Sequence, residues 1–428
     1  MPDPLRLGIA GLGTVGVGVV KIVQTHAELL AARCGRPVSI SAVSARSRGR
    51  NRSADISAYA WEDDPVALAR REDVDVVVEL MGGEDGPALA LTRAAIAAGK
   101  DIVTANKALL AVHGQELAEE AEAASVALRF EAAVAGGIPI IKALTEGMAG
   151  NRITRVMGVM NGTCNYILTR MEDAGLPYET VFDEAAQLGY LEADPNLDVG
   201  GIDAAHKLTL LAAIAFGTRP HFGAIDIEGI QRVSIADIRH AADLGLRIKL
   251  LGVARMTGRG LEQSMSPCLV PADSPLGQLK GGTNMVVIEG DSVGQIVLRG
   301  AGAGEGPTAS AVMADVADLA RGLTLPPFGQ PAATLTPVTA ARATAAKPFY
   351  LRMTLLDRPG ALARVAASLG DAGVSIDRMR QYGHEGTDVP VIIVTHKTTR
   401  DAIDHAMTLF RDTGVVVDDP VAMAIEHV

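Results

Sequence analysis

A buried strand followed at once by a glycine-rich turn is the feature that most constrains the fold of this 428-residue chain. Leu5–Ala10 is nearly all apolar, as is typical of a parallel strand covered on both faces. The sequence GLGTVG follows, and residues 17–32 then have the composition of a helix. Glycines at these positions permit a tight turn and the close approach of a pyrophosphate to the free amides of the helix.

This arrangement predicts a dinucleotide-binding unit, and the alternative is a glycine-rich turn without a ligand. The phosphate-binding turn is predicted to contain Gly11, Gly13, Thr14, Val15 and Gly16.

The second strand of this unit, Val38–Val43, is followed by a basic segment instead of an acidic residue. An Asp or Glu here would bind the ribose 2′-hydroxyl of NAD. The chain has Arg46 and Arg48, and a guanidinium pairs with a phosphate through two parallel hydrogen bonds. Arg46, supported by Arg48, therefore favours NADP over NAD; the alternative is a solvated basic loop.

Strands and helices continue to alternate after this segment, which predicts a doubly wound sheet. Strands are expected at 75–80 and 101–104, with a helix at 87–98 between them. Ligands bind beyond the carboxyl ends of such strands. Thr104 and Lys107 fall at this edge of the sheet, so Lys107 is expected to reach the substrate unless it is simply solvated at the start of a helix.

A charged insert at 189–207, GYLEADPNLDVGGIDAAHK, separates two apolar stretches. Asp203 and Lys207 are four residues apart, so a helix presents them on one face. The apolar run LTLLAAIAF that follows would be buried, which predicts that the charged first turn faces a cleft holding a small polar molecule. The alternative is an ordinary surface ion pair, with Glu192 and Asp194 as solvated loop acids.

Composition limits the class of protein. A formal charge of −11 argues against nucleic acid or an anionic membrane as the main partner, because both recruit clustered Lys and Arg. The longest apolar run, near 208–216, is shorter than a membrane helix requires, and no secretory leader is visible, so a cytoplasmic location is expected. Cys34, Cys164 and Cys268 are widely spaced and are expected to be reduced thiols.

The C-terminal part of the chain is expected to form a separate domain. A proline-rich segment at 326–348 is typical of a linker. The order after Phe349 is strand, helix, strand, strand, helix, strand, a βαββαβ unit of ferredoxin-like type. The sequence DRPGALARVAASLGDAGVSI resembles the ACT domain, which implies that a small amino acid binds at the turn of Asp357 and Gly360.

Taken in order, GLGTVG, VVVELMGG, VTANKALL, the charged insert, GAGAGEGPTAS and the terminal unit resemble homoserine dehydrogenase over nearly the whole length. The resemblance implies reduction of L-aspartate 4-semialdehyde to L-homoserine with a nicotinamide cofactor, on the route to threonine and methionine. It implies four parts: a Rossmann-type NAD(P) domain (1–130, completed by about 300–325), an α+β substrate and dimerisation domain (131–300), the linker (326–348) and a regulatory ACT domain (349–428).

The resemblance also implies site residues. Lys207 is expected to donate the proton to the aldehyde oxygen, with Lys107 beside the nicotinamide and Asp203 essential to the site. Glu192, Asp198 and Asp203 are expected to bind the substrate. A second glycine loop, with Gly302 and Gly304, is expected to contact the cofactor. A sodium ion is expected at Glu131, Val134, Gly136 and Ile138. A homodimer or homotetramer, regulated by an amino acid such as threonine, is also implied.

Two other functions compete with this one. An aldehyde-oxidising dehydrogenase would use Cys164 as a thiolate, but no basic neighbour in the sequence activates it, and a buried structural thiol is favoured. A non-catalytic sensor would bind a nucleotide and an amino acid without turnover, which leaves the charged insert unexplained.

Overall fold

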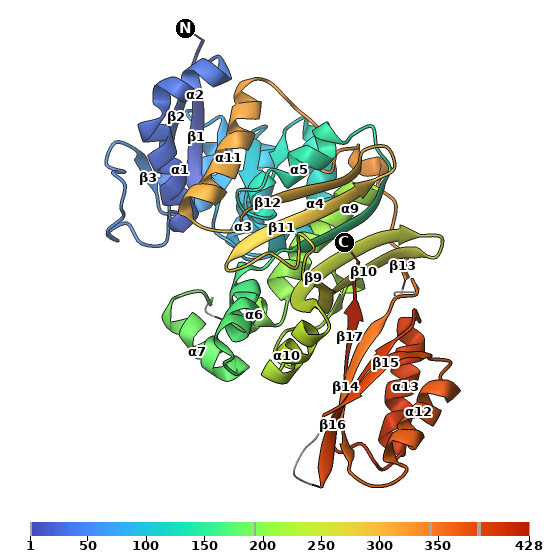
Figure 1. The fold of residues 1–428 in the computed structure, drawn as a ribbon. Helices are drawn as coiled ribbons and strands as arrows, with labels where there is room; N and C mark the ends of the chain where they lie inside the picture. The colour runs from blue at the N-terminus through green and yellow to red at the C-terminus, as the bar shows by residue number, and fades with distance from the viewer. Residues whose placement is uncertain (1, 192–193, 342–344, 383–386, 428) are drawn as a thin grey trace.

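The structure is a computed structural model that describes residues 2–191, 194–341, 345–382 and 387–427. Figure 1 shows the N-terminal α/β part at the top of the molecule, a long mixed sheet below it, and the C-terminal part as a lobe at the bottom. The fold class expected from the sequence, α/β with a doubly wound unit, an α+β unit and a C-terminal βαββαβ unit, is confirmed.

The N-terminal part is built on a parallel sheet with the strand order β3-β2-β1-β4-β5-β6. Its strands are β1 (Leu5–Ala10), β2 (Val38–Ser44), β3 (Ala60–Glu62), β4 (Val76–Glu79), β5 (Asp101–Thr104) and β6 (Leu128–Arg129). The order reverses between β1 and β4, which is the switch point at which open α/β sheets bind their ligands.

Helices from both ends of the sequence cover this sheet. The helix expected at 17–32 is two helices, α1 (Thr14–Thr25) and α2 (Ala27–Cys34), with a sharp bend at His26. Helix α11 (Glu305–Ala320) returns to pack against α1, as Figure 1 shows. A Cβ on Gly18 would lie 2.7 Å from the Glu305 carbonyl oxygen, so this close packing requires glycine.

The remaining helices before α11 follow in chain order: α3 (Pro87–Ala97), α4 (Lys107–Ala124), α5 (Ile140–Lys142), α6 (Gly162–Ala174), α7 (Tyr178–Gln187), α8 (Pro195–Val199), α9 (Ile202–Phe216) and α10 (Ile235–Asp243). Within the described ranges no single helix is long and apolar enough to cross a membrane, although α1 and α2 together have sufficient length and apolar composition.

The second sheet is mixed and has the strand order β12-β11-β7-β9-β10-β17-β14-β16-β15, with β8 and β13 also paired to β10. Its strands in the central part of the chain are β7 (Ile153–Val159), β8 (Asp226–Ile227), β9 (Leu246–Thr257), β10 (Gly260–Pro271), β11 (Thr283–Gly290), β12 (Gly294–Ala301) and β13 (Ala340–Ala341). Because β13 belongs to this sheet, the segment expected to be a plain linker contributes regular structure.

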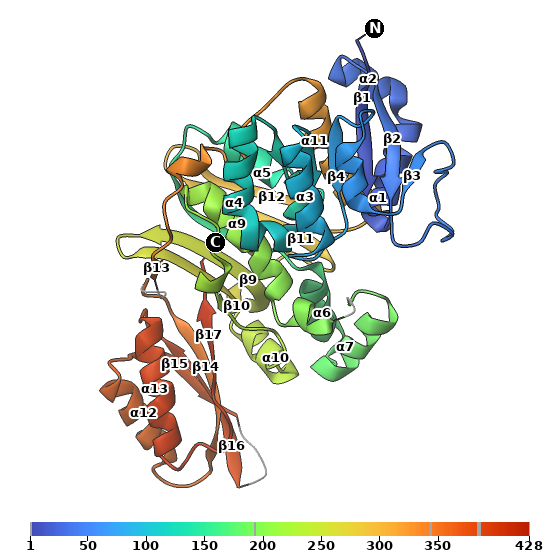
Figure 2. The same ribbon diagram turned by 180° about the vertical axis from the view of Figure 1, so that it is seen from behind.

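The C-terminal lobe continues the same sheet. It contains β14 (Phe349–Leu356), α12 (Ala361–Asp371), β15 (Ile376–Gln381), β16 (Asp388–Thr395), α13 (Arg400–Asp412) and β17 (Val421–Ile425). Figures 1 and 2 show α12 and α13 together on one face of these strands. Strand β17 pairs in parallel with β10 at Cys268 and Leu269.

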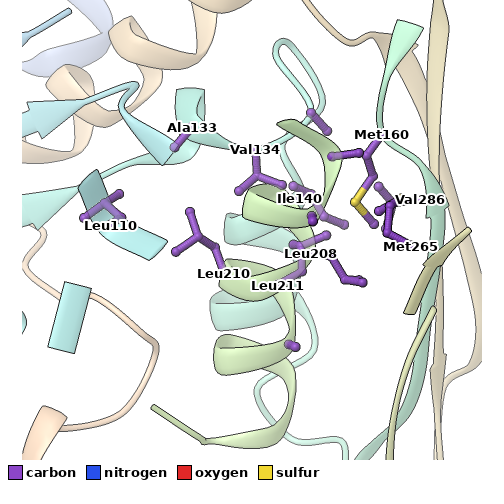
Figure 3. Close-up of a cluster of buried hydrophobic side chains, with 14 of the residues drawn as sticks. Leu110, Ala133, Val134, Ile140, Met160, Leu208, Leu210, Leu211, Met265 and Val286 are labelled. Atoms are coloured by element: carbon purple, nitrogen blue, oxygen red, sulfur yellow. The ribbon is translucent and has the colours of Figure 1, made fainter. Parts of the chain in front are cut away.

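The core of the central part is built around α9. Figure 3 shows Leu208, Leu210 and Leu211 of α9 surrounded by buried side chains from other elements, among them Met265 of β10 and Val286 of β11. Each such side chain contributes about 1.5 to 3 kcal/mol of hydrophobic stabilisation. This burial holds α9 firmly and so fixes the position of its charged first turn.

Candidate active site

A continuous groove lies beyond the carboxyl ends of β1, β4 and β5. It consists of two cavities of about 340 and 480 Å³ that share Leu80, Met81 and Gly82 as wall residues. Gly11, Gly13 and Arg46 line the first cavity, whereas Lys107 and Asp203 line the second. Residues predicted from distant parts of the sequence are therefore brought to one groove.

The turn between β1 and α1 has the geometry that a pyrophosphate requires. Gly11 has a φ of +100°, and a Cβ there would lie 2.4 Å from the Leu80 carbonyl oxygen. At Gly13 a Cβ would meet no atom within 4 Å, so this residue leaves open space beside the helix N-terminus. No side chain caps α1, and its first turn carries no acidic residue, so its amides are available for an anion. The residues present therefore fit a dinucleotide.

A buried glutamate, which the sequence analysis did not single out, organises the end of β4. The Glu79 side chain is fully buried, and its carboxylate accepts hydrogen bonds from the Met81 amide (2.7 Å) and the Thr104 hydroxyl (2.6 Å). These bonds fix the loop at 81–83 and the end of β5. Thr104 thus supports this part of the groove through its hydrogen bond to Glu79. It is not itself among the residues that line the groove.

The basic segment after β2 lies at the other end of the groove. Arg46 and Arg50 line the cavity, but the Arg48 guanidinium lies 5.9 Å from the centre of the Trp61 ring. The Arg52 guanidinium donates to the carbonyl of Ser47 at 2.6 Å and also lies over Trp61. Of the two arginines predicted from the sequence, Arg46 is thus on the cavity wall, whereas Arg48 packs on the loop.

The charged first turn of α9 forms the centre of the second cavity. The Asp203 carboxylate lies between two ammonium groups: Oδ2 is 2.7 Å from Lys207 Nζ, and Oδ1 is 2.9 Å from Lys107 Nζ. Lys207 Nζ also donates to the Met160 carbonyl at 2.8 Å. The predicted i,i+4 pair is therefore a mostly buried cluster and not a surface ion pair, since 11% of each of the Asp203 and Lys207 side chains is exposed.

Asparagine 161 joins this cluster from the segment after β7. Its Oδ1 caps α6 by accepting from the Cys164 amide at 2.8 Å. Its Nδ2 also donates to Asp198 Oδ1 at 3.1 Å and to Asp203 Oδ2 at 3.2 Å. These contacts with the two acids were not predicted, because they depend on segments about 40 residues apart. The only sequence signal for them was Asn-Gly at the end of an apolar run.

The electrostatics of the cavity keep Asp203 ionised. Burial alone would raise the pKa of its carboxyl, but the charges of Lys207 and Lys107 and their hydrogen bonds outweigh burial, and the pKa lies well below its usual range. His206 also lines this cavity, and burial, reinforced by the charge of Lys107, lowers its pKa. The cavity wall thus carries the Asp203 carboxylate and Lys107, and Lys207, which is not among the lining residues, pairs with the same carboxylate.

The geometry disfavours a thiolate at Cys164. Its side chain is fully buried and its Sγ donates to the Asp198 carbonyl at 3.2 Å. Burial, together with the charges of Asp198 and Asp203, raises the thiol pKa well above its usual value. A thiolate is the nucleophile in aldehyde oxidation, and this environment opposes its formation.

Other predicted residues lie outside the groove walls. Gly302 packs so closely on Asn284 that a Cβ would lie 2.0 Å from its Cγ, and Gly304 precedes α11. Asp357 and Gly360 are exposed in the turn before α12 of the C-terminal lobe. Glu192 lies outside the described residues.

The turn at 131–138 is buried except at Gly137 and has unusual backbone geometry. Ala135 and Gly136 both have positive φ angles, of 54° and 58°. The Glu131 carboxylate accepts from the amides of Ile141 and Lys142, at 2.9 Å each, and burial raises its pKa to about 7. Among the described residues, no hydrogen bond to the carbonyl oxygens of Val134 and Gly136 is found. Buried oxygens of this kind suit a hard cation.

Comparisons with known proteins agree with this geometry. The family model described as "Homoserine dehydrogenase, NAD binding domain" matches residues 11–131, that of homoserine dehydrogenase matches 139–317, and that of the ACT domain matches 349–414. A homoserine dehydrogenase of Neisseria gonorrhoeae is 43% identical over 432 residues, which cover 98% of both chains.

Solved structures give the same result. A homoserine dehydrogenase from Thiobacillus denitrificans superposes with a TM-score of 0.94 at 39% identity, over 99% of this chain and 98% of the other. A hyperthermophilic archaeal homoserine dehydrogenase in complex with NADPH matches 74% of this chain and 97% of its own, at 26% identity and a TM-score of 0.63. The chain therefore belongs to the homoserine dehydrogenases, NAD(P)-dependent oxidoreductases, and carries a C-terminal ACT domain.

Proposed function

We propose that Lys207 is the proton donor when the enzyme reduces the aldehyde of L-aspartate 4-semialdehyde to the alcohol of L-homoserine. The observation that carries this proposal is the Asp203 carboxylate between Lys207 and Lys107, at 2.7 and 2.9 Å, in the cavity beside the glycine-rich turn. The nicotinamide cofactor supplies a hydride when bound. Negative charge then builds on the aldehyde oxygen, and a positioned ammonium group stabilises this charge and donates a proton.

Lys107 has a different position and a different proposed role. It begins α4 at the carboxyl edge of the sheet and lines the cavity, and 30% of its side chain is exposed, compared with 11% for Lys207. We assign it to the nicotinamide end of the groove, where its charge orients the substrate and stabilises the developing oxyanion. Asp203 holds both lysines in place. Asp198, and Glu192 by resemblance alone, are assigned to substrate binding.

For the cofactor we propose a preference for NADP. Arg46 lines the ribose end of the groove, and no acidic residue follows β2 directly to repel a 2′-phosphate. The archaeal relative in complex with NADPH supports this choice. Gly302 and Gly304 remain proposed cofactor contacts.

A sodium ion is proposed at the turn formed by Glu131, Val134, Gly136 and Ile138. The two carbonyls that accept no hydrogen bond and the buried Glu131 carboxyl supply oxygen atoms in a confined space. This turn contacts the end of β12, because the Gly137 amide donates to the Ala301 carbonyl at 3.0 Å. The ion would therefore stabilise the contact between this turn and the second sheet.

Regulation by a small amino acid at the turn of Asp357 and Gly360 is proposed for the ACT domain. The continuous sheet from β10 to β17 links this domain mechanically to the catalytic part. A homodimer or homotetramer is proposed from the family resemblance.

The direct test is NADPH oxidation with L-aspartate 4-semialdehyde by the intact chain and by Cys164→Ala. Turnover in both supports the proposal, because the Cys164 thiol has no part in it. Reduction of NADP by this aldehyde that is lost in a folded Cys164→Ala variant would instead move the chemistry to aldehyde oxidation through the thiolate. Binding of NADPH without turnover in the intact chain would contradict the proposed reaction.

A further inference from the structure

Asn161 lies where three segments of the site meet. It follows β7 directly, it caps α6, and its side chain reaches the acidic residues of α8 and α9. The residue is 3% exposed. No bulk water therefore competes for its amide group, and its hydrogen bonds act at low local dielectric.

The amide of Asn161 is fully used. Nδ2 has two protons, and one is directed to Asp198 Oδ1 and the other to Asp203 Oδ2, while Oδ1 accepts from the Cys164 amide. The reversed orientation would place an oxygen against two carboxylates and an NH₂ group against an N–H donor. The hydrogen-bond network thus fixes the orientation of the amide.

Met160, the residue before Asn161, contacts Lys207, the partner of Asp203. The Met160 carbonyl accepts from Lys207 Nζ at 2.8 Å, so one dipeptide holds both Asp203 and Lys207. Asp203 Oδ2 receives both Asn161 Nδ2 and Lys207 Nζ, which leaves Oδ1 to Lys107. Without the neutral donor, Asp203 would be free to rotate, and it would face Asp198 with less compensation for their like charges.

We propose that Asn161 is a positioning residue of the reaction, which acts by holding the Asp203 carboxylate between Lys107 and Lys207. The inference rests on the proposed function of Lys207 and deepens it. It is distinct from helix capping, because capping uses Oδ1 alone, whereas positioning uses both protons of Nδ2.

Two variants separate these roles, because serine and aspartate are both good helix caps but lack the amide donor. Asn161→Ser is expected to keep the melting temperature close to that of the wild type and to lower kcat roughly 10- to 100-fold, the usual effect of losing a hydrogen bond to a charged group. The KM for NADPH is expected to change less than about twofold. A matched control is Asn165→Ser on the same helix, whose amide donates to the Gly281 carbonyl and not to Asp203.

The pH profile gives a readout that capping would not move. Asn161→Asp adds a carboxylate beside Asp203, which favours the protonated form of the neighbouring lysines. The alkaline limb of its kcat profile is expected to move upward by roughly one pH unit. Asn165→Ser is expected to leave that limb in place.

A double-mutant cycle with Asp203→Asn tests the route of action. If Asn161 acts through Asp203, Asn161→Ser costs less than about threefold once Asp203 has been replaced. A wild-type kcat in Asn161→Ser would overturn the inference. So would a loss of kcat in both Asn161 variants that leaves the pH profile unchanged and adds fully to the effect of Asp203→Asn. Absence of turnover in the wild type would instead contradict the proposed function, so the two failures are distinguishable.

Discussion

The Asp203 carboxylate lies 2.7 Å from the Lys207 ammonium group, one turn along α9, and 2.9 Å from the Lys107 ammonium group, which α4 brings from the other domain. Lys107 and Asp203 line one cavity, and the neighbouring cavity at the glycine-rich turn shares Leu80, Met81 and Gly82 with it. A single carboxylate thus joins a lysine of α4 to a lysine of α9.

Replacement of Asp203 tests this link. Asp203→Asn keeps the size of the side chain but removes the charge that holds both ammonium groups. We expect kcat to fall by about 100-fold or more, in the range for a lost general acid–base arrangement, while NADPH affinity stays within about threefold. Steady-state kinetics and cofactor titration measure the two effects. A variant with full activity would show that the ion cluster is only structural.

Arg46 is expected to decide between the two nicotinamide cofactors. In Arg46→Asp the guanidinium is lost and a carboxylate faces the ribose, so the KM for NADPH should rise roughly 10- to 100-fold while that for NADH changes little or falls. The matched control is Arg48→Ala, because Arg48 lies over Trp61 outside the cavity wall. An equal rise for both cofactors would argue against a 2′-phosphate contact.

The proposed sodium site predicts a pH-dependent stability. Burial raises the Glu131 pKa from 4.5 to about 7, so the native state binds the proton more tightly than the unfolded state. The protonated Glu131 carboxyl therefore contributes to the free energy of unfolding. This contribution is fully present below pH 4.5 and is lost as the pH rises to about 7, a change of about 3 kcal/mol at most.

A cation beside the ionised carboxylate offsets that loss. We expect sodium chloride to raise the melting temperature above that in choline chloride of equal ionic strength, and to do so more at pH 8 than at pH 5. In Glu131→Gln, both the pH dependence of the melting temperature and the effect of sodium on it should be smaller. An identical sodium effect at the two pH values would refute the coupling to Glu131.

An ion pair between the buried Asp237 of α10 and Arg352 of β14 joins the central part of the chain to the C-terminal lobe. Asp237 of α10 is fully buried and accepts from Arg352 Nε at 2.6 Å and from the Tyr350 hydroxyl at 3.0 Å. Asp237→Ala leaves Arg352 without this partner, so we expect the free energy of unfolding to fall by about 3 to 5 kcal/mol. Chemical denaturation measures this. A loss below about 1 kcal/mol would show that the junction tolerates the unpaired charge.

Local signals in the sequence predicted much of the fold. β1 and β5 begin and end at the expected residues, because buried parallel strands are nearly continuous apolar runs. The Asp203 and Lys207 pair followed from helical spacing. The bend at His26 was missed because the apolar pattern continues across it, and α2 begins there without a side-chain cap.

The features that were missed depend on tertiary contacts. β17 pairs with β10 more than 150 residues away, and no local pattern in either strand encodes that partner. The Asn161 cap of α6 is a local feature, but the contacts of its side chain with Asp198 and Asp203 require α6, α8 and α9 to converge. Arg48 was predicted at the phosphate because sequence spacing does not show that Trp61 lies beneath its side chain.

The central claim is that Lys207 donates the proton that accompanies hydride transfer. The most direct measurement is the single-turnover rate of NADPH oxidation with L-aspartate 4-semialdehyde, compared between the wild type, Lys207→Met and Lys280→Met, a control lysine paired with Asp173 on the surface. We predict that the rate falls at least about 100-fold in Lys207→Met and is unchanged in the control, with NADPH still bound by both. A wild-type rate in folded Lys207→Met would contradict the account.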